Sequence, residues 1–182
     1  MIRTIKIVIL FLVAAFLAAP QSCSKLDRLT TFHMNFTDTV VLPSTIGLNL
    51  PFNMFTPPIT TNSEDVFAVN DTRKDLIEEI KIESLDLTLF DPESMDFSFL
   101  NSIEIYLDAD TLDATLVAWK YDIKNDVGDT LSLEVTDEDL TIYLLQDQMQ
   151  LKITTVTDKI PMSDASIRID AGFFINAKIL GI

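Results

Sequence analysis

The chain has 182 residues, and its 28 Asp and Glu against 13 Lys and Arg give a formal net charge of −15 at pH 7. This acidity argues against nucleic acid and anionic lipid headgroups as partners, because both are bound through a basic face. The length fits one domain, and the single cysteine excludes an internal disulfide, so hydrophobic packing must stabilise the fold.

The first 22 residues have the features of a cleaved secretory signal peptide. Arg3 and Lys6 precede an apolar run from Ile7 to Ala19, which is the order of the charged and hydrophobic regions in such signals. The run has 13 residues, whereas crossing a bilayer takes about 20 apolar residues. We therefore interpret residues 1–22 as a removable export signal rather than a membrane anchor or a buried helix.

The cysteine at position 23 directly follows this segment. Ser22-Cys23 resembles the processing site of bacterial lipoproteins, in which a small residue precedes a cysteine that is acylated and becomes the new N-terminus. An ordinary cleavage site would instead leave an exported chain with one unpaired thiol. The resemblance implies a covalent lipid on Cys23, where two or three acyl chains give the lasting attachment that one chain does not.

The mature chain would then consist of a short tether and one domain. Residues 23–28 are the acylated cysteine and the polar tether, and residues 29–182 form the domain. Without Arg3 and Lys6, 11 Lys and Arg remain against 28 Asp and Glu, a formal charge of −17. The lipid, rather than the surface charge, must therefore hold the protein to a membrane.

Alternation of apolar and polar residues, the pattern of half-buried strands, dominates the domain. In the first strand the even positions are apolar from Phe32 to Leu42, and only Asp38 interrupts them, which predicts a bulge or bend there. In the last strand every odd position from Ile167 to Ile179 is apolar. The predicted strands, in chain order, are Leu29–Leu42, Ile80–Phe90, Ile103–Leu107, Thr115–Tyr121, Leu131–Val135, Met149–Val156 and Ile167–Ile179.

Two short helices are predicted between the strands. Residues Asp139–Gln146 place apolar side chains at i, i+3 and i+4 spacing, and Thr136 or Asp137 can cap this helix. The same spacing near Thr72–Glu79 predicts a second helix before alternation begins.

Two connections have turn or loop composition. Asn125–Asp129 predicts a hairpin turn between Thr115–Lys124 and Thr130–Val135. Pro43–Thr61 contains four of the seven prolines and several apolar residues, which predicts a loop laid over the core rather than a strand.

Six or seven strands without an alternating strand-helix order predict an all-β fold, an antiparallel β-sandwich of the immunoglobulin-like kind with one or two short helices. The segments Lys81–Asp110 and Ala165–Leu180 resemble parts of uncharacterised lipoproteins of Bacteroidota-type bacteria. The shared features are a strand, a turn with Asp and Phe, a second strand ending in Tyr-Leu and a long final strand. Together with Cys23, this resemblance implies a location and a fold, and it carries no activity.

Carboxylates are the richest chemical resource of the sequence. Asp108, Asp110 and Asp113 follow a predicted strand, and such oxygen-rich loops can bind Ca²⁺, which takes six to eight oxygen ligands. The alternative is a solvated acidic rim, and no other cofactor is expected. No pair of carboxylates has a spacing that indicates a glycosidase. His33 is the sole histidine and is expected to point outward, which argues against a histidine-based catalytic set or zinc site.

Aromatic and hydroxyl residues supply two further candidate sites. Trp119 and Tyr121 share one face of a predicted strand, where they can form a platform for sugar stacking. A tryptophan in the middle of a sandwich strand more often fills the core, and we expect that role for Trp119. Thr39, Thr111 and Thr130 each lie in an Asp-Thr-apolar tripeptide that resembles the O-glycosylation acceptor of Bacteroidota.

These features predict a non-enzymatic outer membrane lipoprotein that acts as a binding or structural accessory module in the cell envelope. Its partners would be the membrane, through the lipid, and another envelope protein or a glycan. One alternative is a surface lipoprotein that binds glycans through Trp119 and Tyr121. The other is an adhesin or pilus-type subunit in which Ile167–Leu180 completes a neighbour's sheet. Both the periplasmic and the cell-surface side of the membrane are compatible with the sequence.

Overall fold

The computed structural model describes residues 31–178, apart from positions 46, 62, 71 and 110. The export signal, Cys23, the tether and residues 179–182 lie outside the described residues. The strands are β1 (Thr31–Leu42), β2 (Phe52–Phe55), β3 (Ile59–Thr60), β4 (Ile77–Asp91), β5 (Leu100–Ala109), β6 (Leu112–Lys120), β7 (Thr130–Ser132), β8 (Glu134–Val135), β9 (Gln148–Thr157) and β10 (Ala165–Ala177). The helices are α3 (Ser63–Val69) and α4 (Thr141–Leu144), with 3-10 turns η1 (Lys74–Leu76) and η2 (Phe97–Phe99).

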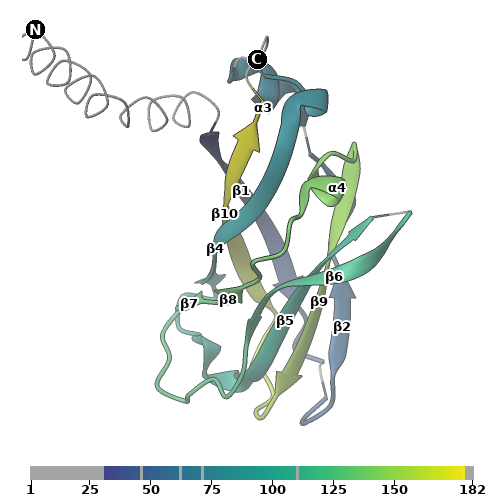
Figure 1. Ribbon diagram of the computed structural model, residues 1–182. Coiled ribbons are helices and arrows are strands. Elements are labelled where there is room, and N and C mark those ends of the chain that lie inside the picture. The colour runs from purple at the N-terminus through teal and green to yellow at the C-terminus, as the bar shows by residue number, and fades with distance from the viewer. Residues whose placement is uncertain (1–30, 46, 62, 71, 110, 179–182) are drawn as a thin grey trace, which may run out of the picture.

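The strands form two antiparallel sheets that pack face to face (Figure 1). The first sheet has the order β1-β10-β4-β7. The second has the order β2-β9-β5-β6-β8, and β3 also pairs with β9. All of these strand pairs are antiparallel. The prediction of an all-β antiparallel sandwich is therefore confirmed.

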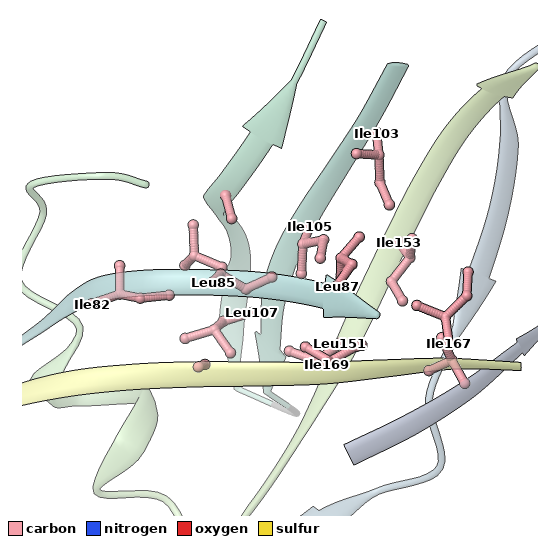
Figure 2. Close-up of a cluster of buried hydrophobic side chains, with 14 of the residues drawn as sticks. Ile82, Leu85, Leu87, Ile103, Ile105, Leu107, Leu151, Ile153, Ile167 and Ile169 are labelled. Atoms are coloured by element: carbon pink, nitrogen blue, oxygen red, sulfur yellow. The ribbon is translucent and has the colours of Figure 1, made fainter. Parts of the chain in front are cut away.

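The hydrophobic core lies between the two sheets, where the inward positions of their strands meet (Figure 2). Ile105 of β5 and Ile169 of β10 come from opposite sheets and are at most 1% exposed. Complete burial of such a side chain contributes about 1.5–3 kcal/mol. This packing stabilises a chain whose single cysteine allows no internal disulfide.

The strands nearest the two ends of the described chain lie side by side. β1 pairs with β10 in one unbroken register, from Thr31 opposite Asn176 to Leu42 opposite Ala165. The predicted alternation holds in both strands, and the odd positions of β10 are all buried. Asp38 pairs within this register without a shift, so of the predicted bulge or bend the bulge is wrong. The Thr39 amide donates a hydrogen bond to the Asp38 carboxylate at 2.8 Å, which gives this half-buried charge a partner.

β10 pairs with β4 on its other side and therefore lies inside the first sheet. In the adhesin hypothesis this strand would complete the sheet of a neighbouring molecule. Here it connects two strands of its own chain. His33, on β1, is exposed as expected, and its Nε2 atom lies 3.3 Å from Glu83 Oε2 on β4.

Residues 130–135 cross from one sheet to the other. β7 pairs with β4 in the first sheet, whereas β8 pairs with β6 in the second. The predicted strand Leu131–Val135 is thus two short strands. The predicted hairpin at Asn125–Asp129 is wrong, because the chain leaves β6 and enters the opposite sheet, where Leu131 is buried in the core.

The proline-rich segment Pro43–Thr61 contains two strands that the sequence did not predict. β2 and β3 both pair with β9 at the edge of the second sheet. Pro51 precedes β2, and Pro57 and Pro58 separate it from β3, so no proline interrupts either strand. Proline is tolerated at the ends of edge strands. The prolines of this segment therefore argued only against a central strand, and edge strands remained possible.

The helix predicted at Asp139–Gln146 is present but shorter, as α4. Neither Thr136 nor Asp137 caps it. Instead, the Asp139 carboxylate accepts hydrogen bonds from the backbone amides of Thr141, at 3.0 Å, and Ile80, at 3.2 Å. Asp139 thereby ties the first turn of α4 to β4.

The helix predicted near Thr72–Glu79 is wrong, because only the 3-10 turn η1 forms before β4 begins at Ile77. An unpredicted helix, α3, precedes it and buries Phe67 completely. Within the described ranges, no helix is long and apolar enough to cross a membrane.

Candidate functional site

The outer surface of the second sheet carries a cluster of aromatic and charged side chains. Ile103, Ile105 and Leu107 of β5 are buried in the core, so Glu104 and Tyr106 between them point away from it. The adjacent strands β6 and β9 add further side chains to the same surface. We call this set the aromatic face: Glu104, Tyr106, Trp119, Tyr121 and Lys152.

Glu104 holds two tyrosines together. Its Oε2 atom accepts a hydrogen bond from the Tyr106 hydroxyl at 2.8 Å, and its Oε1 atom accepts one from the Tyr121 hydroxyl at 2.7 Å. The hydrogen bond to Glu104, together with burial and the nearby negative charge, raises the pKa of Tyr106 to about 12. The hydrogen bond to Glu104 is also the main cause that raises the pKa of the exposed Tyr121. Both phenols are therefore neutral donors at physiological pH.

Trp119 belongs to this surface and not to the core, so the expectation that it fills the core is wrong. The register of β6 against β5 shifts between Ala118 and Leu116, which leaves Val117 as an extra residue. Val117 and Ala118 are both buried as a result, and Trp119 lies opposite Glu104 on the outer side. Its indole Nε1 donates a hydrogen bond to Glu134 at 3.2 Å. A bulge of this kind reverses the alternation that the sequence pattern assumed.

Side chains of β9 and β2 extend the aromatic face across the sheet. The Lys152 ammonium lies 5.2 Å from the centre of the Tyr106 ring, a cation–π contact. Thr154 lies opposite Glu104, and its hydroxyl donates to the Asn53 side chain at 2.7 Å. Phe55 lies opposite Lys152 and is 53% exposed. The aromatic face therefore adjoins hydroxyl, amide and phenyl groups toward the sheet edge.

This arrangement can bind a flat ligand with a mixed apolar and hydroxylated surface. Exposed or half-buried rings offer stacking area, and the carboxylates, phenols and ammonium offer hydrogen-bond donors and acceptors. The rings are fixed by hydrogen bonds to Glu104 and Glu134 before any ligand arrives, which reduces the entropy lost on binding.

Replacing Glu104 by Gln is expected to bring the pKa of Tyr106 down from about 12 toward the ordinary value of about 10. The carboxamide keeps the shape but removes the negative charge and one of the two acceptor oxygens. Absorbance at 295 nm during alkaline titration measures the change. Glu83→Gln, on the other sheet, is the control and should leave the curve unaltered. An identical titration of the Glu104→Gln protein would contradict the assignment.

Sequence reasoning placed Trp119 and Tyr121 together but missed Glu104, Tyr106 and Lys152. The signal that could have found Glu104 and Tyr106 is their position between the buried residues of one strand. The contribution of Lys152 depends on the pairing of β5 with β9, which are separated by three other strands in the chain.

The structure does not bring the three aspartates of the calcium hypothesis into a described site. Asp108, at the end of β5, accepts a hydrogen bond from the Gln150 side chain at 2.8 Å. Asp113 is exposed, and its backbone carbonyl accepts a hydrogen bond from the Tyr143 hydroxyl at 2.6 Å. Asp110 lies outside the described residues. Among the described residues there is no group of three His, Cys, Asp or Glu side chains that could hold a metal ion.

The three threonines of the glycosylation hypothesis are all exposed. Thr39 lies on the outer side of β1, Thr111 lies in the turn before β6, and Thr130 begins β7. Glycosylation of these residues stays a prediction. Cys23, the predicted lipid attachment point, lies outside the described residues.

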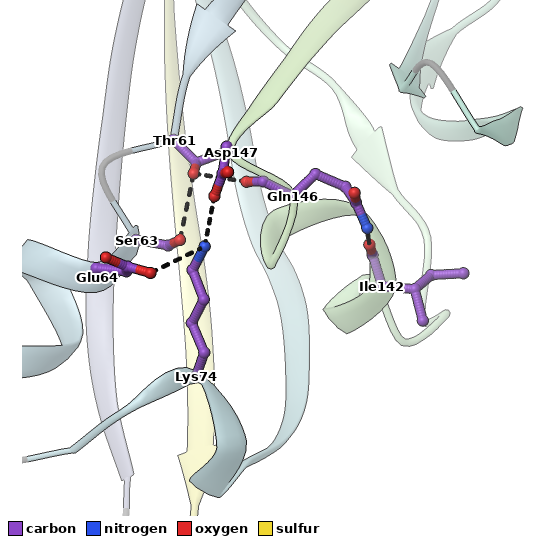
Figure 3. Close-up of polar contacts among 7 residues, drawn as sticks. All are labelled: Thr61, Ser63, Glu64, Lys74, Ile142, Gln146 and Asp147. Atoms are coloured by element: carbon purple, nitrogen blue, oxygen red, sulfur yellow. Dashed lines mark hydrogen bonds and ion pairs between the residues drawn. The ribbon is translucent and has the colours of Figure 1, made fainter.

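A second polar cluster joins α3, η1 and the segment before β9 (Figure 3). Lys74 Nζ lies 2.8 Å from Asp147 Oδ1 and 3.7 Å from Glu64 Oε1. The hydrogen bond to Asp147 is the main cause that raises the pKa of Lys74, and the same bond lowers the pKa of Asp147. Thr61 donates to the Gln146 carbonyl at 2.8 Å. These side chains satisfy one another, so the cluster holds α3, η1 and the segment before β9 together.

Comparisons with known proteins give no family for the chain. No protein-family model matches it, and no curated protein does. Solved structures with a similar course of the chain include Desmodium yellow mottle tymovirus, with 11% identity and a TM-score of 0.32 over 84% of this chain and 91% of the other. Turnip yellow mosaic virus has 13% identity and a TM-score of 0.32 over 84% and 96% of the two chains. Similarities at these TM-scores assign neither a family nor a function to this protein.

Proposed function

We propose that the protein is a non-enzymatic, membrane-anchored envelope lipoprotein that binds neutral glycans through its aromatic face. The observation that carries the proposal is the joint placement of Trp119, Tyr121 and Tyr106 on one outer surface, with Glu104 between them. Sugar rings present apolar faces that stack on aromatic side chains, and their hydroxyls match the surrounding donors and acceptors.

Charge supports neutral rather than acidic glycans. The chain carries a formal net charge of −15. The aromatic face contains one carboxylate, Glu104, and one ammonium, Lys152, and Glu134 beside it adds a second carboxylate. A polysaccharide of uronic or sialic acids would be repelled by this surface. Unmodified hexose or pentose polymers carry no such penalty.

The location rests on the N-terminal sequence. A charged start, a short apolar run and Ser22-Cys23 support export and lipid attachment at Cys23 in the manner of Bacteroidota-type lipoproteins. The immunoglobulin-like assignment belongs to the same proposal, and two antiparallel sheets packed face to face support it. The aromatic face would then project from the membrane on a tethered domain.

Trp119→Ala is expected to weaken binding of neutral polysaccharide at least about tenfold, or about 1.4 kcal/mol, because a stacking ring is lost. Affinity electrophoresis in gels that contain mannan, xylan, laminarin or starch measures the retardation of the chain. Phe90→Ala, at a 46% exposed phenylalanine on β4 outside the aromatic face, is the matched control and should migrate like the wild type. Equal retardation of the Trp119→Ala and wild-type proteins by every binding polysaccharide would refute the assignment.

The anchor has a separate test. A radioactive fatty acid supplied to growing cells should label the wild-type protein and leave the Cys23→Ala protein unlabelled. Protease treatment of intact cells then assigns the side of the membrane, since only a surface protein is degraded while a periplasmic control survives. A wild-type protein that takes up no label would contradict the lipid anchor while leaving the glycan site untouched.

A further inference from the structure

The edges of the two sheets are protected unequally. β7 has three residues, β8 has two, and β2 has four and follows a proline. Short edge strands and prolines are common means of preventing a sheet from pairing with another chain. β1 is the exception among the described edge strands. It has twelve residues, no proline, no Lys or Arg and no bulge in its pairing with β10.

The sandwich is open behind the first half of β1. Phe32, Met34 and Phe36 point toward the core but are only half-buried, whereas Val40 and Leu42 in the second half are 7% and 1% exposed. A cavity of about 380 Å³ lies beside Met34 and Phe36. Its other apolar walls are formed by Val66, Leu144, Met149 and Phe173. An additional strand beside β1 would cover this opening.

The scarcity of acidic residues in the first half of β1 favours a second copy of the same chain as the source of the additional strand. From Phe32 to Thr37 the only ionisable side chain is His33, and the first acid is Asp38. Two chains with a formal net charge of −15 each can approach closely only where acids are sparse. The segment Phe32–Thr37 provides such a surface, and its apolar residues match those of an identical strand.

We propose that two copies of the protein pair antiparallel through β1, in a register centred on Met34. Met34 then lies opposite Met34 of the second copy, and Phe32 lies opposite its Phe36, all on the core-facing side. A centre at Asp38 would instead place the two Asp38 side chains opposite each other, which is unfavourable. The four-stranded sheets of both copies join into one sheet, and the added strand closes the cavity beside Met34 and Phe36. This pairing leaves the aromatic face free, because that face lies on the other sheet.

Cross-linking of single cysteines tests the register. In the full-length chain with Cys23→Ala, a cysteine at Asn35 lies diagonally opposite its own copy, about 7–8 Å away. A cysteine at Val41 lies about 46 Å from its own copy, at about 3.3 Å per residue along the paired strands. Both wild-type side chains are exposed on the same side of β1. A short bismaleimide is therefore expected to join Asn35→Cys chains and to leave Val41→Cys chains unlinked.

Sedimentation equilibrium tests the pairing itself. The Cys23→Ala protein is expected to form a dimer with a dissociation constant of about 1–100 µM. Asn35→Lys should raise this constant at least about tenfold by placing two like charges near the dimer axis, while Val41→Lys should leave it unchanged. Circular dichroism confirms that each variant is folded. A chain that stays monomeric at about 200 µM, or a dimer weakened only by Val41→Lys, would overturn the proposal.

Discussion

A chain that ends at Asp164, and therefore lacks β10, is expected to show no cooperative unfolding transition. β1 and β4 lose the strand that both of them pair with. The core also loses Ile167, Ile169, Phe173 and Ile175, each at most 4% exposed. Burial of four such side chains contributes about 6–12 kcal/mol, which is comparable to the whole stability of a typical domain, about 5–15 kcal/mol. Urea titration followed by far-UV circular dichroism measures the transition.

A peptide of residues 165–178 supplies the control for this truncation. Added in excess, it should restore β-structure to the shortened chain, whereas a peptide of scrambled order should not. A shortened chain that unfolds cooperatively by itself, at the urea midpoint of the full chain, would show that the strand is dispensable. That result would also support the adhesin hypothesis, in which the domain stays folded while this strand pairs with a neighbouring molecule.

Ile105→Ala is expected to lower the free energy of unfolding by about 2–5 kcal/mol, the usual cost of truncating a fully buried isoleucine. The side chain is 0% exposed in β5, whose neighbours β6 and β9 hold it in the centre of the second sheet. The loss combines the transfer of the missing methyl groups with the cavity that they leave. Urea titration with an unchanged slope and a lower midpoint is the expected form of the result.

Ile142→Ala is the matched control for the substitution at Ile105. Ile142 lies on α4 and is 56% exposed, so the same chemical change removes little buried surface. Surface substitutions of this kind usually change stability by less than about 0.5 kcal/mol. Equal losses in the two variants would contradict the position of Ile105 in the core.

Strand positions were predictable wherever alternation continued without interruption. β10 shows this best, because every odd residue is apolar and the strand is regular against β1. Prediction failed where pairing partners decide the structure. Residues 130–135 read as one strand, yet their two halves pair with β4 and β6 in different sheets. β2 and β3 form because β9 offers them an edge, and local composition does not reveal that edge.

The aromatic face was predictable in part for the same reason. Trp119 and Tyr121 are close in sequence, so one pattern suggested both. The bulge at Val117, which turns Trp119 outward, depends on the register of β6 against β5. The hydrogen bond between Tyr121, directly after β6, and Glu104, on β5, needs the folded sheet. Local sequence therefore indicated candidate aromatic residues, and tertiary pairing determined which surface they occupy.

The pairing of β1 with β10 has a consequence for the order in which the protein is made and folded. Thr37 and Asp170, whose side chains form a hydrogen bond of 2.8 Å, are 133 positions apart. Contacts between such distant residues form late and slow folding. β1 is not joined to the rest of the first sheet until β10, and so almost the whole chain, has been synthesised. If the chain is exported as we propose, its N-terminal part can thus enter a translocation channel while the domain still lacks the strand that completes it.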